Sequence, residues 1–224
     1  MRSTLQDIGA LNNLAVFSLV RGNIEEAYAT LETAVHNFHH NLGDDDGAES
    51  SDDDQGAFHG IRAVPIDPEL SIADYLFSPE NVFQIYDFAF LLRLQNLESD
   101  DIAITLLYNF GLVLQRRGIL EGKHKFLRKA LMIYGMALDL LQDEDLAHRN
   151  SATMTLLHLA TRANQGFIYY YKLDHENVIL CAEHVRDILQ DCPGLLASVD
   201  VLFFRRIIFY IEVFGFPKNV SPAA

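Results

Sequence analysis

The sequence predicts a mainly all-α fold built from helical hairpins. Three observations support this prediction. Apolar residues recur with a helical period over most of the chain, glycine-containing breaks separate pairs of such segments, and small residues recur where paired helices would cross. One hairpin cannot bury its own apolar face, so we expect about three hairpins stacked as an α-solenoid, followed by a C-terminal helix.

The first hairpin occupies residues 1–43. Its first segment has an apolar stripe at positions i, i+3, i+4 and i+7, formed by Leu11, Leu14, Ala15 and Ser18. Arg21-Gly22-Asn23 interrupts the helix. The second segment then places apolar and small residues on one face, namely Ile24, Ala27, Leu31, Ala34 and Val35. An antiparallel pair of helices follows from this pattern.

A change of composition separates this hairpin from the next. Residues 44–56 contain six Asp and one Glu, which predicts a disordered acidic loop. Within the loop, Ser50 and Ser51 each precede an Asp by three positions, a spacing that acidophilic kinases accept as phosphorylation sites. Residues 57–99 form an insertion of extended or helical structure. Residues 82–94 fit a strand and a helix equally well, and residues 61–66 and 84–92 suit a short β-hairpin.

The second hairpin is predicted at residues 100–142, with its turn at Arg117-Gly118. Small residues recur there at steps of seven, twelve and seven, on Gly111, Gly118, Ala130 and Ala137. In the first hairpin the steps are seven, five and seven, on Ala15, Gly22, Ala27 and Ala34. The seven extra residues predict a hairpin longer by about 10 Å, since each helical residue adds about 1.5 Å.

The remaining segments are less regular. A third, degenerate hairpin is predicted at residues 143–192, where Leu173 stands at the position of the expected turn glycine. A C-terminal capping helix at residues 193–216 is apolar on almost every face, and residues 217–224 form a tail. All of these segments are expected to form one structural domain.

The spacing of Ala15, Gly22, Ala27 and Ala34 resembles that of the tetratricopeptide repeat. The resemblance implies a superhelix of helical hairpins (TPR-like) whose concave groove binds a peptide segment of a partner. Successive units start 96 and 55 residues apart instead of at the family's period of 34, measured between Ala15, Gly111 and Gly166. The repeats are therefore expected to be degenerate and separated by insertions.

An asparagine recurs two positions before the small residue of each first helix, as Asn13, Asn109 and Asn164. In the family that this chain resembles, such positions line the groove, and an amide can donate to and accept from the backbone of an extended peptide. Phe17 and Tyr108 would add apolar contact area. The alternative is a structural role, in which each asparagine forms a capping or interhelical hydrogen bond.

Six basic residues cluster in the second hairpin: Arg116, Arg117, Lys123, Lys125, Arg128 and Lys129. A solvated helix face is the favoured interpretation. The alternative is an internal docking site for the acidic loop, weakened by physiological salt.

Composition argues against several classes of function. The net charge of −14 disfavours nucleic acid and anionic membranes as partners, and the chain has neither a membrane-spanning apolar stretch nor a signal peptide, which favours a cytoplasmic or nuclear location. No cofactor motif occurs, no metal site is expected, and His36, His39 and His40 fit a solvated helix end. A thiol-dependent enzyme using Cys181 and His184 is the least favoured hypothesis.

The sequence therefore predicts a non-enzymatic protein–protein interaction or scaffold module, with a protein or peptide partner of unknown identity. The alternative is a homodimer that assembles through the apolar C-terminal helix.

Overall fold

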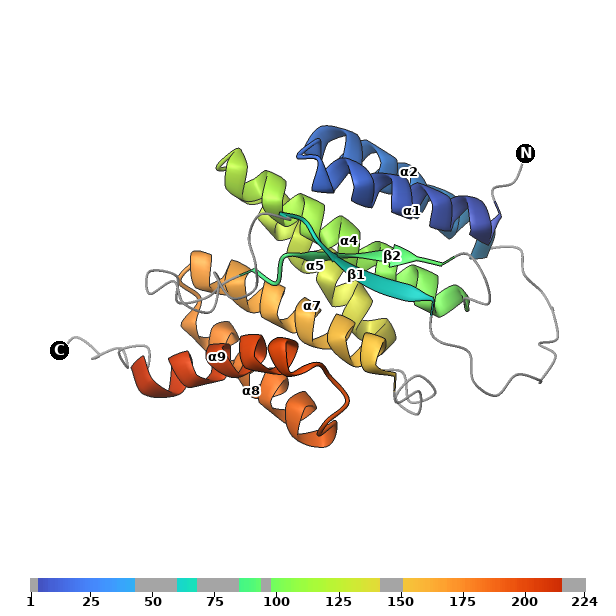
Figure 1. Cartoon of the computed structure of the whole chain (residues 1–224). Coiled ribbons are helices and arrows are strands. Elements are labelled where there is room, and N and C mark those ends of the chain that lie inside the picture. The colour runs from blue at the N-terminus through green and yellow to red at the C-terminus, as the bar shows by residue number, and fades with distance from the viewer. Residues whose placement is uncertain (1–3, 43–59, 68–84, 94–97, 142–150, 215–224) are drawn as a thin grey trace. The chain divides into compact units, whose positions relative to one another are not determined.

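The computed structural model describes residues 4–42, 60–67, 85–93, 98–141 and 151–214 (Figure 1). Within these ranges the chain is mainly helical, as predicted, with seven helices and one sheet of two strands. The acidic loop at 44–56, including Ser50 and Ser51, lies outside the described residues. So do the tail at 217–224 and much of the insertion.

The backbone contacts divide the chain into two compact units, whereas the sequence predicts one structural domain. The first unit consists of residues 1–68 and 87–153. The second consists of residues 69–86 and 154–224. The chain thus passes from the second unit to the first between Tyr86 and Asp87.

Two helical hairpins form the first unit. Helix α1 (Leu5–Val20) packs against α2 (Ile24–Leu42), and α4 (Ser99–Leu120) packs against α5 (His124–Leu141). Thr4 begins α1 with a capping box, because its hydroxyl accepts a hydrogen bond from the Asp7 N–H while the Asp7 carboxylate accepts one from the Thr4 N–H. Helix α4 is the core of this unit, since every residue from 101 to 115 is buried.

The small residues of α4 allow α5 to approach closely. A Cβ atom at Gly111 would lie 2.5 Å from the Tyr134 ring, and one at Gly118 would lie 2.7 Å from the Leu127 side chain. Gly118 is therefore a packing residue inside a helix that continues to Leu120. The predicted turn at Arg117-Gly118 is wrong.

The turn of this hairpin is formed by Gly122, which has a φ of 63°. Its N–H donates to the Ile119 carbonyl, and the Lys123 N–H donates to the Gly118 carbonyl. Gly22, with a φ of 81°, makes the same Schellman pattern at the end of α1. The turn lies 13 residues after Asn109 but nine after Asn13, so only four of the seven extra residues belong to α4. The other three lie between the turn and Ala130, in α5, which has 18 residues against 19 in α2. The hairpin therefore gains about one turn, roughly 5 Å, instead of the predicted 10 Å.

The second unit contains α7 (Ala152–Tyr171), α8 (His175–Asp191) and α9 (Ser198–Phe214). The turn after α7 repeats the Schellman pattern without a glycine. Leu173 takes the left-handed conformation with a φ of 60°, and its N–H donates to the Tyr170 carbonyl. The sequence correctly identified Leu173 as the residue at the glycine position.

The sheet of the first unit pairs β1 (Ile61–Pro65) with β2 (Phe88–Leu92) in antiparallel orientation. The predicted pair of strands is confirmed, and the strand alternative is correct for residues 88–92. Strand β2 packs against α1 and α4 (Figure 1). Its aromatic side chain Phe90 is fully buried and contacts the Tyr108 ring edge-on.

Candidate functional site

The main chain of β2 is held by asparagine side chains of the helices. Asn109 on α4 is fully buried, and its Oδ1 accepts a hydrogen bond from the Phe90 N–H at 2.9 Å. Its Nδ2 donates to the Phe90 carbonyl at 2.7 Å. One amide therefore satisfies both main-chain groups of a strand residue, as a neighbouring strand would.

Asn13 on α1 makes the same two-bond pairing with Leu92. Its Oδ1 accepts from the Leu92 N–H at 2.7 Å, and its Nδ2 donates to the Leu92 carbonyl at 2.7 Å. The neighbouring Asn12 is fully buried; it donates to the Phe90 carbonyl at 3.0 Å and accepts from Asn109 at 2.8 Å. Asn12 links the two pairings, and its position next to Asn13 was the only sequence signal for this role.

Asn164 makes the third pairing, within the second unit. Its Oδ1 accepts from the Tyr86 N–H at 2.8 Å, and its Nδ2 donates to the Tyr86 carbonyl at 3.3 Å. The Tyr86 side chain is buried between Phe203 and Phe204 of α9, and its hydroxyl donates to Asp200 at 3.0 Å. Burial raises the pKa of Asp200 and raises that of Tyr86 well above its usual range.

Asn109 and Asn13 thus bind Phe90 and Leu92 of β2 in the first unit, and Asn164 binds Tyr86 in the second unit. All three ligands belong to the chain itself. Tyr108 also contributes, because its hydroxyl donates to the Phe88 carbonyl at 3.0 Å. Phe17 does not, since its side chain is exposed on α1. Binding of a partner's peptide by these asparagines stays a prediction.

The two edges of the sheet differ in their hydrogen bonding. The Ile66 N–H donates to the Asp87 carbonyl, so residues 62, 64 and 66 direct their main-chain groups toward β2. Ile61, Ala63 and Pro65 alternate with them and direct theirs away from it. Within the described part of the chain no hydrogen bond reaches the outward groups of these three residues. The asparagines close one edge of the sheet, while nothing in the described ranges pairs with the other edge, along β1.

An ion pair that the sequence did not predict fixes the start of β2. The buried Asp87 carboxylate accepts from Arg116, with 2.8 Å between Oδ1 and Nε and a second contact from the guanidinium. Arg116 is one of the six clustered basic residues. Its partner could not be identified from the sequence because 29 positions separate the two residues.

The other basic residues of the cluster have diverse surroundings. Arg117 pairs with Glu25 and Glu121 and lies over the Tyr28 and Phe126 rings, and Lys123 pairs with Glu121. Lys125 contacts the Phe126 ring. Arg128 and Lys129 are exposed. Three of the six charges are thus neutralised by carboxylates within the first unit. Docking of the acidic loop on this cluster stays a prediction, because the loop lies outside the described residues.

The Cys181 thiol has the opposite environment from a catalytic cysteine. It is buried on α8, and burial raises its pKa to about 12, so the thiol stays protonated at neutral pH. Burial also lowers the pKa of His184, with a further contribution from the charge of Arg162. The pair therefore lacks the thiolate that the thiol-dependent hypothesis requires.

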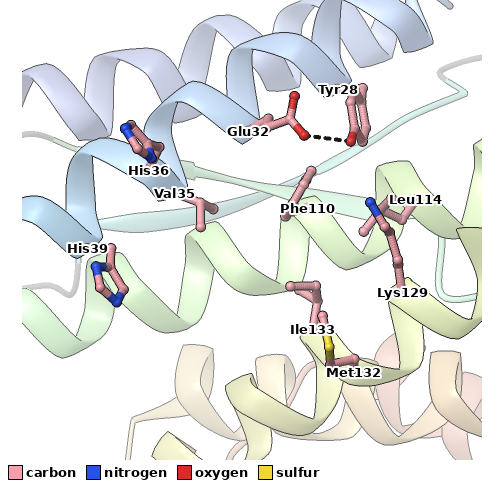
Figure 2. A pocket seen from close by; sticks show the side chains of 10 residues that line it. All are labelled: Tyr28, Glu32, Val35, His36, His39, Phe110, Leu114, Lys129, Met132 and Ile133. Atoms are coloured by element: carbon pink, nitrogen blue, oxygen red, sulfur yellow. Dashed lines mark hydrogen bonds between the residues drawn. The ribbon is translucent and has the colours of Figure 1, made fainter.

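A hollow lies in the first unit, between α2 and α5 (Figure 2). We call it the outer groove; its cavity volume is about 340 Å³. Side chains of α2 form one wall and those of α5 the other, with α4 beneath them. The lining residues are Tyr28, Glu32, Val35, His36, His39, Phe110, Leu114, Lys129, Met132 and Ile133.

The described residues contain no group of three or more His, Cys, Asp or Glu side chains placed to bind a metal ion. His36 and His40 contact each other edge-on at the end of α2, with 4.4 Å between ring centres. None of the helices in the described ranges combines the length and apolar character needed to cross a membrane.

Comparisons of the chain with models of protein families, with curated proteins and with solved structures gave no match.

Proposed function

We propose that this protein is a non-enzymatic interaction module that binds an extended segment of another protein as a third strand alongside β1. The helical hairpins act as its scaffold, and we infer that they stack as degenerate, TPR-like repeats. The common Schellman turns and the close helix contacts at Gly111 and Gly118 support this arrangement.

One observation supports the binding mode above all others, namely the difference between the two sheet edges. Asn12, Asn13, Asn109 and Tyr108 satisfy the main chain along the edge of β2. The edge of β1 has no such cover within the described residues. Proteins usually block or cover an exposed strand edge, because its free N–H and C=O groups bind other strands. An edge that is left open beside one that is closed by four side chains is suited to strand addition.

The asparagines serve this function by fixing the platform. A sheet of two strands is marginally stable by itself. Here Phe90 and Ala89 are fully buried, and the paired amides fix the register of β2 against the helices. A partner that displaced β2 would have to unbury these side chains and out-compete a tethered segment with a high effective concentration. Addition at β1 avoids this cost.

The edge specifies the chemistry of its partner. Ile61 and Ala63 each offer one N–H and one C=O, whereas Pro65 offers only a C=O. The partner must therefore be extended. Its residue paired with Ala63 cannot be proline, because its C=O must accept from the Ala63 N–H and its N–H must donate to the Ala63 carbonyl. Arg62 is exposed on β1, so an acidic residue opposite it would form a favourable cross-strand pair.

The test changes the number of outward N–H groups. Partners are identified by proximity labelling in the native cell. Calorimetry then measures the affinity of their binding segments for the wild-type protein and for two variants, Ala63→Pro and Pro65→Ala. Ala63→Pro removes the central outward N–H, at a site where an edge strand tolerates proline. We expect a loss of about tenfold, since one hydrogen bond contributes about 1 kcal/mol and the unpaired acceptor adds to the loss. Pro65→Ala adds an outward N–H and is expected to preserve or increase affinity.

Hydrogen exchange provides the structural control. The inward amides of Arg62 and Val64 should stay protected in both variants, which verifies that β1 still pairs with β2. Partner binding should newly protect the Ala63 amide in the wild type. A partner that binds the Ala63→Pro protein with wild-type affinity, or that leaves the Ala63 amide unprotected, would refute strand addition.

The second candidate function is self-association through α9. Leu202 and Phe209 are both more than half exposed and lie seven positions apart, on the same helix face. An exposed apolar pair of this kind is typical of an association surface. Analytical ultracentrifugation at micromolar concentration tests it: a dimer that Leu202→Glu converts to a monomer supports this function, and a monomeric wild-type protein excludes it.

A further inference from the structure

The outer groove has an apolar floor inside a strongly acidic chain. Phe110, Leu114 and Ile133 are buried beneath it, and the Tyr28 ring lies 5.6 Å from that of Phe110. On the α5 wall the side chain of Met132 is 59% exposed, and that of Met136, which lies one turn further along α5 and outside the lining, is 47% exposed. The exposed Met132 above an apolar floor can adapt to a binding partner, because the unbranched thioether side chain repacks easily.

We propose that the outer groove binds an amphipathic α-helix of another protein, with the helix's apolar side chains on the groove floor and one of its carboxylates paired with Lys129. This partner site is separate from the open edge of β1, and it does not depend on strand addition.

The groove favours a helical occupant over an extended one. Its walls and floor are helices, whose interior main-chain groups are already hydrogen-bonded, so they offer no strand edge. An extended segment placed there would leave its own N–H and C=O groups without protein partners, whereas a helix satisfies them internally. The α2 wall from Tyr28 to His39 spans about 16 Å, which matches three turns of a bound helix.

The charges of the groove favour an acidic partner. Lys129 is exposed on the α5 wall, and no ion pair reaches its ammonium from the described part of the chain. Glu32 on the opposite wall is already engaged, since its carboxylate accepts from the Tyr28 hydroxyl at 2.7 Å (Figure 2). Both charges remain, but the Glu32 carboxylate already has a hydrogen-bond donor, whereas the Lys129 ammonium can pair with a carboxylate of the partner.

A displayed library of 14-residue helical peptides provides the probe. Leucine is fixed at positions i, i+3 and i+7, and the remaining positions are randomised. The library is selected on the full-length wild-type protein and, in parallel, on a Met132→Glu protein. Met132 is mostly exposed, so this change places a charge at the groove without disturbing the core. We expect peptides that are enriched on the wild type alone and that carry Asp or Glu next to their leucines.

Two charge reversals then test the ion pair. Lys129→Glu should lower the affinity for the acidic peptides at least tenfold. It should raise the affinity for versions of these peptides in which the acidic residue is replaced by lysine. Lys172→Glu changes the net charge equally at an exposed position of the second unit and should leave affinity unchanged. Ala63→Pro should also leave affinity unchanged, which separates this site from the edge of β1. Equal enrichment on the wild-type and Met132→Glu proteins, or acidic peptides that bind Lys129→Glu with full affinity, would overturn the proposal.

Discussion

Replacement of Asn109 by aspartate tests whether its amide holds the internal strand. The two side chains have nearly the same shape, so Asn109→Asp changes only the Nδ2 group into an oxygen. Oδ1 can still accept from the Phe90 N–H. The new oxygen, however, faces the Phe90 carbonyl and the Asn12 Oδ1, which lie 2.7 and 2.8 Å from the wild-type nitrogen.

The size of the expected loss in stability follows from the buried oxygens that are left without a hydrogen-bond donor. The buried Asn12 Oδ1 loses its donor, at about 1–3 kcal/mol, whereas the Phe90 carbonyl keeps the donor from Asn12. The introduced carboxylate oxygen is also buried without a donor, at about 1–3 kcal/mol more, so we expect a loss of roughly 2–6 kcal/mol in the free energy of unfolding at pH 7. Burial beside two oxygens raises the pKa of the introduced carboxyl. Protonation then restores one donor, so the deficit should shrink to roughly 1–3 kcal/mol as the pH falls through that raised pKa.

Chemical denaturation followed by circular dichroism measures this deficit between pH 4 and 8, because the chain contains no Trp as a fluorescence reporter. The difference from the wild type at each pH isolates the new carboxyl, since all other titrating groups are shared. Gln6→Glu introduces the same charge at an exposed position of α1 and should not show a deficit that shrinks as the pH falls. A stability equal to the wild type at pH 7, or a deficit independent of pH, would show that the amide is not required.

Three further predictions concern the second unit. Leu173→Gly should increase the free energy of unfolding by about 0.5–1 kcal/mol, because Leu173 holds a left-handed conformation with a φ of 60° and a side chain that is 75% exposed; a loss of stability would contradict this. Burial, with smaller contributions from neighbouring positive groups, lowers the pKa of His158 from 6.5 to about 4. The folded state therefore favours the neutral imidazole. Its contribution of roughly 3 kcal/mol to the free energy of unfolding should be present above pH 6.5 and be lost as the pH falls toward 4. Proton NMR titration measures the pKa, and the stability of His158→Gln across the same pH range measures the contribution. Iodoacetamide at pH 7.5 should modify the partly exposed Cys192 and leave Cys181, whose pKa is raised to about 12, unmodified until the protein unfolds; rapid labelling of Cys181 in the folded protein would revive the thiol-enzyme hypothesis.

The local sequence pattern was sufficient to predict the first helical hairpin and to single out the recurring asparagine. The apolar period and the break at Gly22 located the first hairpin, and the shared register singled out Asn13, Asn109 and Asn164. These signals are short in range, because a helical face repeats every three or four residues and a helix end depends on its own last turn.

Several features required the tertiary structure. Gly118 and Gly122 are both glycines near a helix end, and only the packing of Gly118 on Leu127 and the positive φ of Gly122 show which one makes the turn. The local sequence allows a helix to end at either glycine. Packing against α5 decides which of them ends α4.

The partners of the asparagines are the clearest case. An amide at a fixed position of a helix predicts a backbone ligand but does not identify it, since hydrogen bonding to N–H and C=O is independent of sequence. Asn13 and Leu92 are 79 positions apart, as is typical of contacts that form only when the chain has folded. The sequence by itself singled out Asn13, Asn109 and Asn164 as side chains that either bind an extended segment or form a capping or interhelical hydrogen bond. The tertiary structure decided that Tyr86, Phe90 and Leu92 of the same chain occupy them and that, among the described residues, nothing pairs with the outward edge of β1.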